Sequence, residues 1–212
     1  MKKIIVRGII KLIYLWGCIW YDKKYLVGKN FNKEHFSIGW KWILKYWFKQ
    51  KILRYNVEVK FPVPPTTQYS NPQNIIFDPD DMRSMQSMGC YFQAINAKLI
   101  IGKGTKIAPN CGFITTNHDL NDLEKPAQGK DIIIGKKCWI GMNSVILPGV
   151  ILGEHTIVGA GSIVTKSFPE GNCVIAGNPA KLIRKLSNDN RRNKEINHEK
   201  NSYNYRCKAT IY

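Results

Sequence analysis

Hydrophobic positions in the second half of the chain recur with a period of six. From residue 134 to 169 each six-residue unit opens on an aliphatic side chain: Ile134, Ile140, Ile146, Leu152, Val158 and Val164. Gly follows in four units, and the fifth position is small or β-branched: Cys138, Ser144, Val150, Thr156 and Ser162. Because such a unit cannot bury its apolar face alone, successive turns must stack. The pattern predicts an all-β solenoid, a parallel β-helix, over residues 75–186.

The same period starts earlier and is interrupted once. Residues 101–118 read IGKGTK, IAPNCG and FITTNH, and strand-like apolar segments precede them from about Ile75. Residues 119–131 are polar, contain Pro126 and Gly129, and do not follow the period. We therefore predict a loop over residues 117–133 that leaves the solenoid. Loops held at the corner of a rigid scaffold commonly carry function.

Residues 1–74 show a different pattern, in which basic residues lie at helical spacing beside aromatic ones. Two stripes have four-residue spacing: Lys3, Arg7, Lys11, and Lys41, Lys45, Lys49. Cations beside a Trp- and Tyr-rich face favour a helical extension that lies at a membrane interface. The alternative is a pair of helices that pack on the β-helix with solvated lysines.

The ends of the first region are defined by charge and by proline. Arg7 and Lys11 interrupt the first apolar run, which argues against a secretory signal, and residues 12–21 are too few to span a bilayer. A proline-rich linker, residues 61–79, separates the region from the repeats. Residues 187–212 are rich in Asn and charge, and we expect a polar, mobile tail there.

Charge and cysteine content refine this picture. The chain of 212 residues has a formal net charge of +17, and residues 1–60 hold 14 basic side chains against three acidic ones. A basic partner surface therefore belongs to the N-terminal third, and an anionic membrane is the partner we expect. Nothing in the sequence localises a base-reading element, so we expect no specific nucleic acid. The six Cys form no CxxC pair and are interpreted as reduced, space-filling thiols in a cytoplasmic protein.

The repeats, the NHD segment at 117–119 and AGNPAKLI at 176–183 resemble the hexapeptide-repeat acyltransferases. The resemblance extends over about residues 88–186 and is greatest to the sugar O-acetyltransferases of capsule and lipopolysaccharide assembly. It implies a left-handed β-helix, a homotrimer with sites between subunits, acetyl-CoA as the donor, and a sugar or glycan acceptor. A lipid-linked acceptor would place the protein peripherally on the inner face of the plasma membrane. We also expect a short capping helix after Gly177, because the open end of a solenoid needs a cover.

The resemblance assigns residue roles. It makes His118 the general base of a direct attack without an acyl-enzyme, and the backbone N–H of Gly141 the oxyanion donor. Acceptor contacts are expected from Gln93, Asn96, Asn117 and Asp119. The pantetheine groove would include Trp139, Gly141, Met142, Gly159, Ala160 and Thr165. The CoA phosphates would meet Lys166, Lys181 and Arg184.

Three alternatives remain at this stage. An N-acetyltransferase acting on an amino sugar or sugar nucleotide, or a serine acetyltransferase, would share the repeats, although the N-terminal domains usual in those relatives are missing. A non-catalytic β-helix scaffold would not explain the NHD loop. A metal-dependent hydratase needs several His ligands, whereas only His118 and His155 lie in the repeats, at different positions of the unit. We therefore expect no metal.

Overall fold

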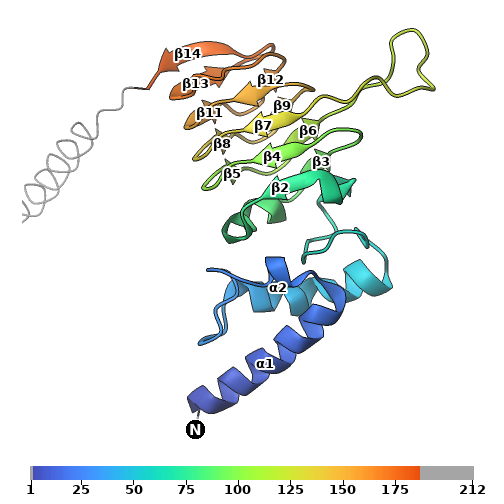
Figure 1. Ribbon diagram of the computed structural model, residues 1–212. Coiled ribbons are helices and arrows are strands. Elements are labelled where there is room, and N and C mark those ends of the chain that lie inside the picture. The colour runs from blue at the N-terminus through green and yellow to red at the C-terminus, as the bar shows by residue number, and fades with distance from the viewer. Residues whose placement is uncertain (1, 187–212) are drawn as a thin grey trace, which may run out of the picture.

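Most of the molecule is a stack of short strands wound into three sheets (Figure 1). The computed structural model describes residues 2–186, so the predicted mobile tail and Cys207 lie outside the described residues. Figure 1 shows the stacked coils at one end of the molecule and two helices at the other.

The chain passes from one sheet to the next and returns, so that from β3 to β12 each sheet collects every third strand. Sheet A contains β1 (Gln68–Ser70), β3 (Tyr91–Gln93), β6 (Gly112–Ile114), β9 (Val145–Ile146) and β12 (Ile163–Val164). Sheet B contains β2 (Ile75–Phe77), β4 (Leu99–Ile101), β7 (Ile132–Ile134) and β10 (Ile151–Leu152). Sheet C contains β5 (Lys106–Ile107), β8 (Trp139–Ile140), β11 (Thr156–Val158), β13 (Cys173–Ala176) and β14 (Lys181–Lys185). All neighbours pair in parallel except β13 and β14. The predicted parallel, coiled architecture is confirmed.

The repeat positions form the core of the coil. All six aliphatic residues that open the units between 134 and 169 are buried, and so are the five small residues at the fifth position. Aromatic rings continue this core toward the first coils, where the Phe92 and Phe113 rings stack at 5.2 Å. The glycines at the second position let neighbouring coils approach closely. A Cβ on Gly135 would lie 2.6 Å from the backbone nitrogen of Glu154.

Two boundaries differ from the prediction. The prediction of a capping helix after Gly177 is wrong for residues 181–185. These residues form β14, which pairs antiparallel with β13. The chain reverses at Gly177, whose φ is +105°. The returning strand then supplies hydrogen-bond partners to an edge that a helix would leave unpaired. The coil also begins before residue 75, since β1 already pairs in parallel with β3. Pro64 and Pro65 precede this edge strand and Pro72 follows it, and proline is tolerated at such positions.

The N-terminal region is built on α1 (Lys2–Trp20) and α2 (Ile38–Trp47), and α2 continues into a π-helical turn, η2 (Phe48–Ile52). A short 3₁₀ turn, η1 (Lys23–Tyr25), follows α1, and three more lie between strands of the first coil: η3 (Pro72–Asn74), η4 (Pro79–Asp81) and η5 (Ser84–Gln86). Trp40 and Ile43 are fully buried between the helices. For Trp40 and Ile43 the interfacial prediction is therefore wrong: they pack against Tyr14 and Gly17 of α1, whereas the alternative had the helices pack on the β-helix. No helix within residues 2–186 has the length and apolar character needed to cross a membrane.

A buried amide holds the end of this region together. The Gln50 side chain, 1% exposed, donates to the carbonyls of Val59 (3.0 Å) and Phe61 (3.1 Å), and its Oε1 accepts the Tyr21 hydroxyl (3.1 Å). Because buried carbonyls need donors, Gln50 fixes how the chain enters the first coil. No periodic pattern identifies this residue in the sequence.

Candidate functional site

The loop between β6 and β7 is a hairpin that projects from the turn between sheets A and B (Figure 1). At its base, the Ala127 N–H donates to the Asn117 carbonyl (2.8 Å) and the Asp119 N–H donates to the Lys125 carbonyl (2.9 Å). Where the loop returns, Gly129 lies against the backbone of Asn96, and a Cβ there would be 2.7 Å from the Asn96 carbonyl oxygen. The loop is therefore ordered at its base by the coil beneath it.

His118 sits in this paired base with an exposed ring. Its Nδ1 lies 2.7 Å from the carbonyl oxygen of Leu123, across the hairpin. Because a carbonyl can only accept, Nδ1 carries the proton and the neutral ring has its lone pair on Nε2. Within residues 2–186, Nε2 has no hydrogen-bond partner. The ring is oriented and its free nitrogen can take a proton.

Two residues predicted to contact the acceptor, Asp119 and Gln93, make hydrogen bonds within the loop and its base and none to the His118 ring. The Asp119 carboxylate accepts the N–H groups of Asn121 (2.8 Å) and Asp122 (3.3 Å) and so stabilises the next turn. The Gln93 side chain accepts the Thr116 N–H (3.0 Å), one coil below. Both side chains have structural roles here, whereas Asn117 remains exposed.

A pocket of about 270 Å³ opens beside the loop base. Its lining consists of Asn117, Ala127, Gln128, Lys130, Leu147, Pro148 and Thr165. The structure thus brings Asn117 together with Thr165, two residues that were predicted separately. Lys130 supplies a cation that the sequence did not single out, because the loop follows no period. A pattern of basic residues at loop ends could have identified it.

The structure contradicts the prediction that the Gly141 N–H is a free donor. That N–H donates to the Val158 carbonyl (2.9 Å) in the hydrogen bonding between coils. The next N–H along the chain, that of Met142, has no acceptor among the described residues. The six-residue period locates this corner but does not tell which of its amides is used in the ladder.

The predicted site residues divide between two edges of the coil. Those at or near the turn from sheet A to sheet B are Gln93, Asn96, Asn117, His118, Asp119, Thr165 and Lys166. Those on sheet C or at the turn from sheet C to sheet A are Trp139, Gly141, Met142, Gly159, Ala160, Lys181 and Arg184. The width of sheet A separates the two groups within one chain. One protomer therefore does not bring its own His118 to its own Met142.

The group on sheet C presents exposed apolar surface with cations above it. Trp139 is 55% exposed and Met142 is 45% exposed. Lys181 and Arg184 are exposed on β14, in the last coil of the same sheet. Lys166 is exposed at the other edge, with its Nζ 5.8 Å from the centre of the Phe168 ring.

Two buried thiols at repeat corners, those of Cys111 and Cys138, are not candidate nucleophiles. A hydrogen bond with Cys90, together with burial, raises the pKa of the Cys111 thiol, and burial raises the pKa of the Cys138 thiol. Since the thiolate is the reactive form, both act as packing groups. The five Cys within residues 2–186 are free.

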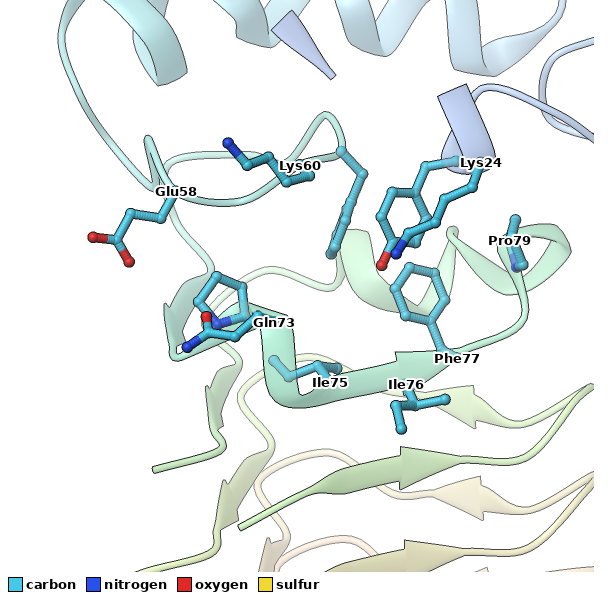
Figure 2. Close-up of a pocket in the computed structure, with 11 residues that line it drawn as sticks. Lys24, Glu58, Lys60, Gln73, Ile75, Ile76, Phe77 and Pro79 are labelled. Carbon is cyan, nitrogen blue, oxygen red and sulfur yellow. The ribbon is translucent and has the colours of Figure 1, made fainter. Parts of the chain in front are cut away.

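A larger pocket, of about 580 Å³, lies where the N-terminal region meets the first coil (Figure 2). Figure 2 shows the Phe77 ring inside it and the Lys24, Glu58 and Lys60 side chains around its rim. Its lining contains no His, the usual general base near neutral pH, and its ionisable groups are Lys24, Tyr25, Glu58 and Lys60. Because His118 lies in the loop, the candidate site remains there.

Two further observations concern the other His and metal ligands. His155 lies at the turn between sheets B and C, and its Nδ1 is 3.3 Å from the Asn172 side-chain oxygen. No group of three or more His, Cys, Asp or Glu within residues 2–186 could hold a metal ion.

Comparison with known proteins relates the repeats to a family. The sequence pattern described as "Bacterial transferase hexapeptide (six repeats)" matches residues 131–166. The chain is 43% identical over 95 residues to the putative acetyltransferase YJL218W of Saccharomyces cerevisiae, a match that covers 43% of this chain and 47% of the relative. It is 42% identical over 90 residues to the galactoside O-acetyltransferase of Escherichia coli K12, covering 41% and 44%. The matched segment thus spans less than half the length of these relatives.

Two solved structures match a larger share of this chain, each with a TM-score below 0.5. A maltose O-acetyltransferase from Clostridium difficile 630 superimposes with a TM-score of 0.48 at 30% identity, covering 59% of this chain and 66% of that one. A galactoside acetyltransferase in complex with coenzyme A gives a TM-score of 0.47 at 31% identity, covering 58% and 60%. From the repeat match, residues 131–166 are identified as repeats of the bacterial transferase hexapeptide family.

Proposed function

We propose that the protein transfers an acetyl group from acetyl-CoA to a sugar hydroxyl. The observation that carries the proposal is the His118 ring, which is fixed through Nδ1 by the Leu123 carbonyl and has Nε2 free at the base of the loop. The names of the relatives, which include a galactoside O-acetyltransferase and a putative acetyltransferase, support the same reaction class.

His118 acts as a general base in direct attack. Its Nε2 takes the proton of the acceptor hydroxyl while the hydroxyl oxygen bonds to the thioester carbonyl carbon. The carbon–sulfur bond then breaks, and the departing thiolate takes the proton back from the imidazolium. The acetyl ester and CoA are the products, and the ring returns to its neutral form without an acyl-enzyme.

The oxyanion of this reaction needs an N–H donor that is not used elsewhere. We assign that role to the Met142 N–H in place of Gly141, since Gly141 already donates to Val158. The exposed Trp139, Met142 and Ala160, with the half-buried Gly159, would accommodate the pantetheine arm. Lys166, Lys181 and Arg184 would meet the phosphates as charge-assisted donors.

A homotrimer would complete the site. His118 and Met142 lie at different edges of one coil, so they can face the same substrate only across an interface between two copies. Exposed apolar side chains lie on both sides of such an interface: Leu120 (93%) and Leu123 (67%) on the loop, and Trp139 and Met142 near the other edge. Cyclic association of identical copies would pair each loop with a neighbouring sheet.

The remaining details are part of the same proposal. The coil winds with a left hand, as in the acyltransferases that the sequence resembles. The acceptor is a glycan of surface polysaccharide assembly, presented on a lipid at the inner face of the membrane. Reduced thiols and the need for acetyl-CoA favour a cytoplasmic location.

A transfer assay tests this function. The full chain is incubated with acetyl-CoA and a panel of sugars and glycans, free thiol is followed over time, and the products are analysed by mass and by alkali lability. We expect thiol release that depends on one acceptor class and a product whose acetyl group alkali removes, since esters hydrolyse readily.

Other outcomes distinguish the alternatives. An alkali-stable acetyl product would mean transfer to an amine and would contradict O-acetylation. A protein that neither binds acetyl-CoA nor consumes it with any acceptor would instead fit the scaffold alternative.

A further inference from the structure

Within residues 2–186, one face of helix α1 has no partner. Its inner face packs on the rest of the N-terminal region through Ile10 and Ile13, and Gly17 lies so close to Ile43 that a Cβ would meet its side chain at 2.9 Å. The side chains on the opposite side are exposed: Ile4 (75%), Ile5 (60%), Ile9 (47%), Leu12 (68%), Leu15 (54%), Trp16 (37%) and Ile19 (68%). We call this set the outer face of α1.

The spacing makes the outer face continuous. Residues 5, 9, 12, 16 and 19 follow each other at intervals of four and three, so they lie in one stripe along the 19-residue helix. An apolar stripe of this length in contact with water is unfavourable, and exposed patches of this kind mark interaction sites. Figure 1 shows α1 at the end of the molecule remote from the last coils.

A row of cations runs along one edge of the outer face. Lys3, Arg7 and Lys11 are exposed and lie between the apolar stripe and the packed face. Arg7 forms an ion pair with Glu34, and the exposed Lys3 and Lys11 flank that pair. A hollow of about 400 Å³ at this edge is lined by Lys3, Val6, Arg7, Glu34 and His35. It is a place where an anionic headgroup could bind beside the apolar stripe.

Aromatic rings extend the outer face onto the neighbouring helix. Trp16 packs edge-on against Trp47 at 5.1 Å between ring centroids, and Trp47 contacts Phe48 at 5.9 Å. Phe48 and Leu44 are each 50% exposed. Trp rings are amphipathic and favour the boundary between headgroups and acyl chains.

From this arrangement we propose that α1 lies in the surface of an anionic bilayer, with its outer face among the acyl chains and Lys3, Arg7 and Lys11 at the headgroups. Charge complementarity selects this occupant over a second copy of the chain, because two copies would bring the like-charged edges of α1 together. The binding surface is the apolar stripe of α1 with its cationic edge. Trp40 and Ile43 of α2 take no part in it, since both are buried. The proposal does not depend on acetyl transfer.

Vesicle flotation tests the proposal with the full chain. Vesicles of phosphatidylcholine alone are compared with vesicles that also contain phosphatidylglycerol, at low and high salt. We expect flotation with the anionic vesicles and weaker flotation at high salt, which screens the cations. Leu12→Ser combined with Ile19→Ser should weaken binding by about tenfold, since both side chains leave the acyl boundary.

Matched variants make the result specific. Leu182→Ser combined with Ile183→Ser removes two exposed apolar residues from β14 and should leave flotation unchanged. Lys3→Gln combined with Lys11→Gln should reduce flotation, whereas Lys98→Gln combined with Lys106→Gln, exposed lysines of the coil, should not.

Two results would overturn the proposal. The first is that the wild-type protein does not float with anionic vesicles, or that the β14 variant reduces flotation as much as the α1 variant does. The other is a change of oligomer mass on Leu12→Ser with Ile19→Ser, without any effect on flotation, which would identify the outer face as a contact between copies.

Discussion

Single residues at the loop base and at the coil corners do most to define the site. The Leu123 carbonyl decides which nitrogen of His118 is free, and the Val158 carbonyl decides that Met142, and not Gly141, has an unused N–H. The first is a side chain–backbone contact within the loop, and the second is a backbone contact between neighbouring coils. They follow from the fold and not from the identity of the reactive residue.

The close approach of neighbouring coils gives a prediction for Gly135. A Cβ at this position would lie 2.6 Å from backbone atoms of the next coil, which cannot move independently. Gly135→Ala should therefore lower the free energy of unfolding by about 1–3 kcal/mol, the usual cost of overpacking. Urea or thermal unfolding measures the change.

Gly112→Ala is the control for Gly135. Its Cβ would meet only the Val145 side chain, at 3.6 Å, which is ordinary van der Waals contact, so its stability should stay close to wild type. Equal unfolding midpoints for the two variants would show that the coil spacing is not rigid.

Sequence periodicity predicted the coil because it records burial directly. The residues that open each unit, such as Ile140 and Val158, must point inward for any coil to form. The loop was visible as a break in the period. The pattern could not identify the Leu123 partner of His118, the buried Gln50 or the return of β14, because each depends on contacts between segments that share no repeat.

At the scale of elements, β14 matters because it replaces the expected cap with an exposed cationic strand. Its sequence KLIRK pairs with β13 along one edge, and every residue in it is exposed. In the proposed function this strand lies on the side of the coil where the CoA phosphates would bind.

Arg184→Ala tests that role. Loss of one charge-assisted contact should raise the KM for acetyl-CoA by up to about tenfold, the equivalent of 1.4 kcal/mol, with little change in kcat, since a contact remote from the reacting carbonyl supplies uniform binding. Lys106→Ala, on β5 of the same sheet, is the matched control. An equal rise in KM with a truncated pantetheine donor, which lacks the phosphates, would exclude the proposed contact.

At the scale of the whole molecule, the proposed site needs groups from both edges of the coil. Association of several copies of the chain would bring the two edges together. His118 belongs to the edge between sheets A and B, and Ala160 lies at the edge between sheets C and A. If the site forms between copies, damage to one edge can be compensated by an intact edge on a neighbour.

Subunit mixing checks this directly. His118→Ala and Ala160→Trp should each abolish transfer, the first by removing the base and the second by filling the groove at an exposed position. When the two variants are unfolded together and refolded, mixed oligomers should regain part of the wild-type rate, because some interfaces then combine two intact edges. Mixed oligomers without any activity would place both residues in a site within one chain.

The most direct measurement is the transfer rate of His118→Ala against wild type, with acetyl-CoA and the acceptor class found in the transfer assay. Since the ring is exposed and outside the core, melting temperature and oligomer mass should stay the same. We expect transfer to fall by about 10²–10⁴-fold, the usual contribution of a general base. Full activity in a folded His118→Ala protein would contradict the proposed mechanism.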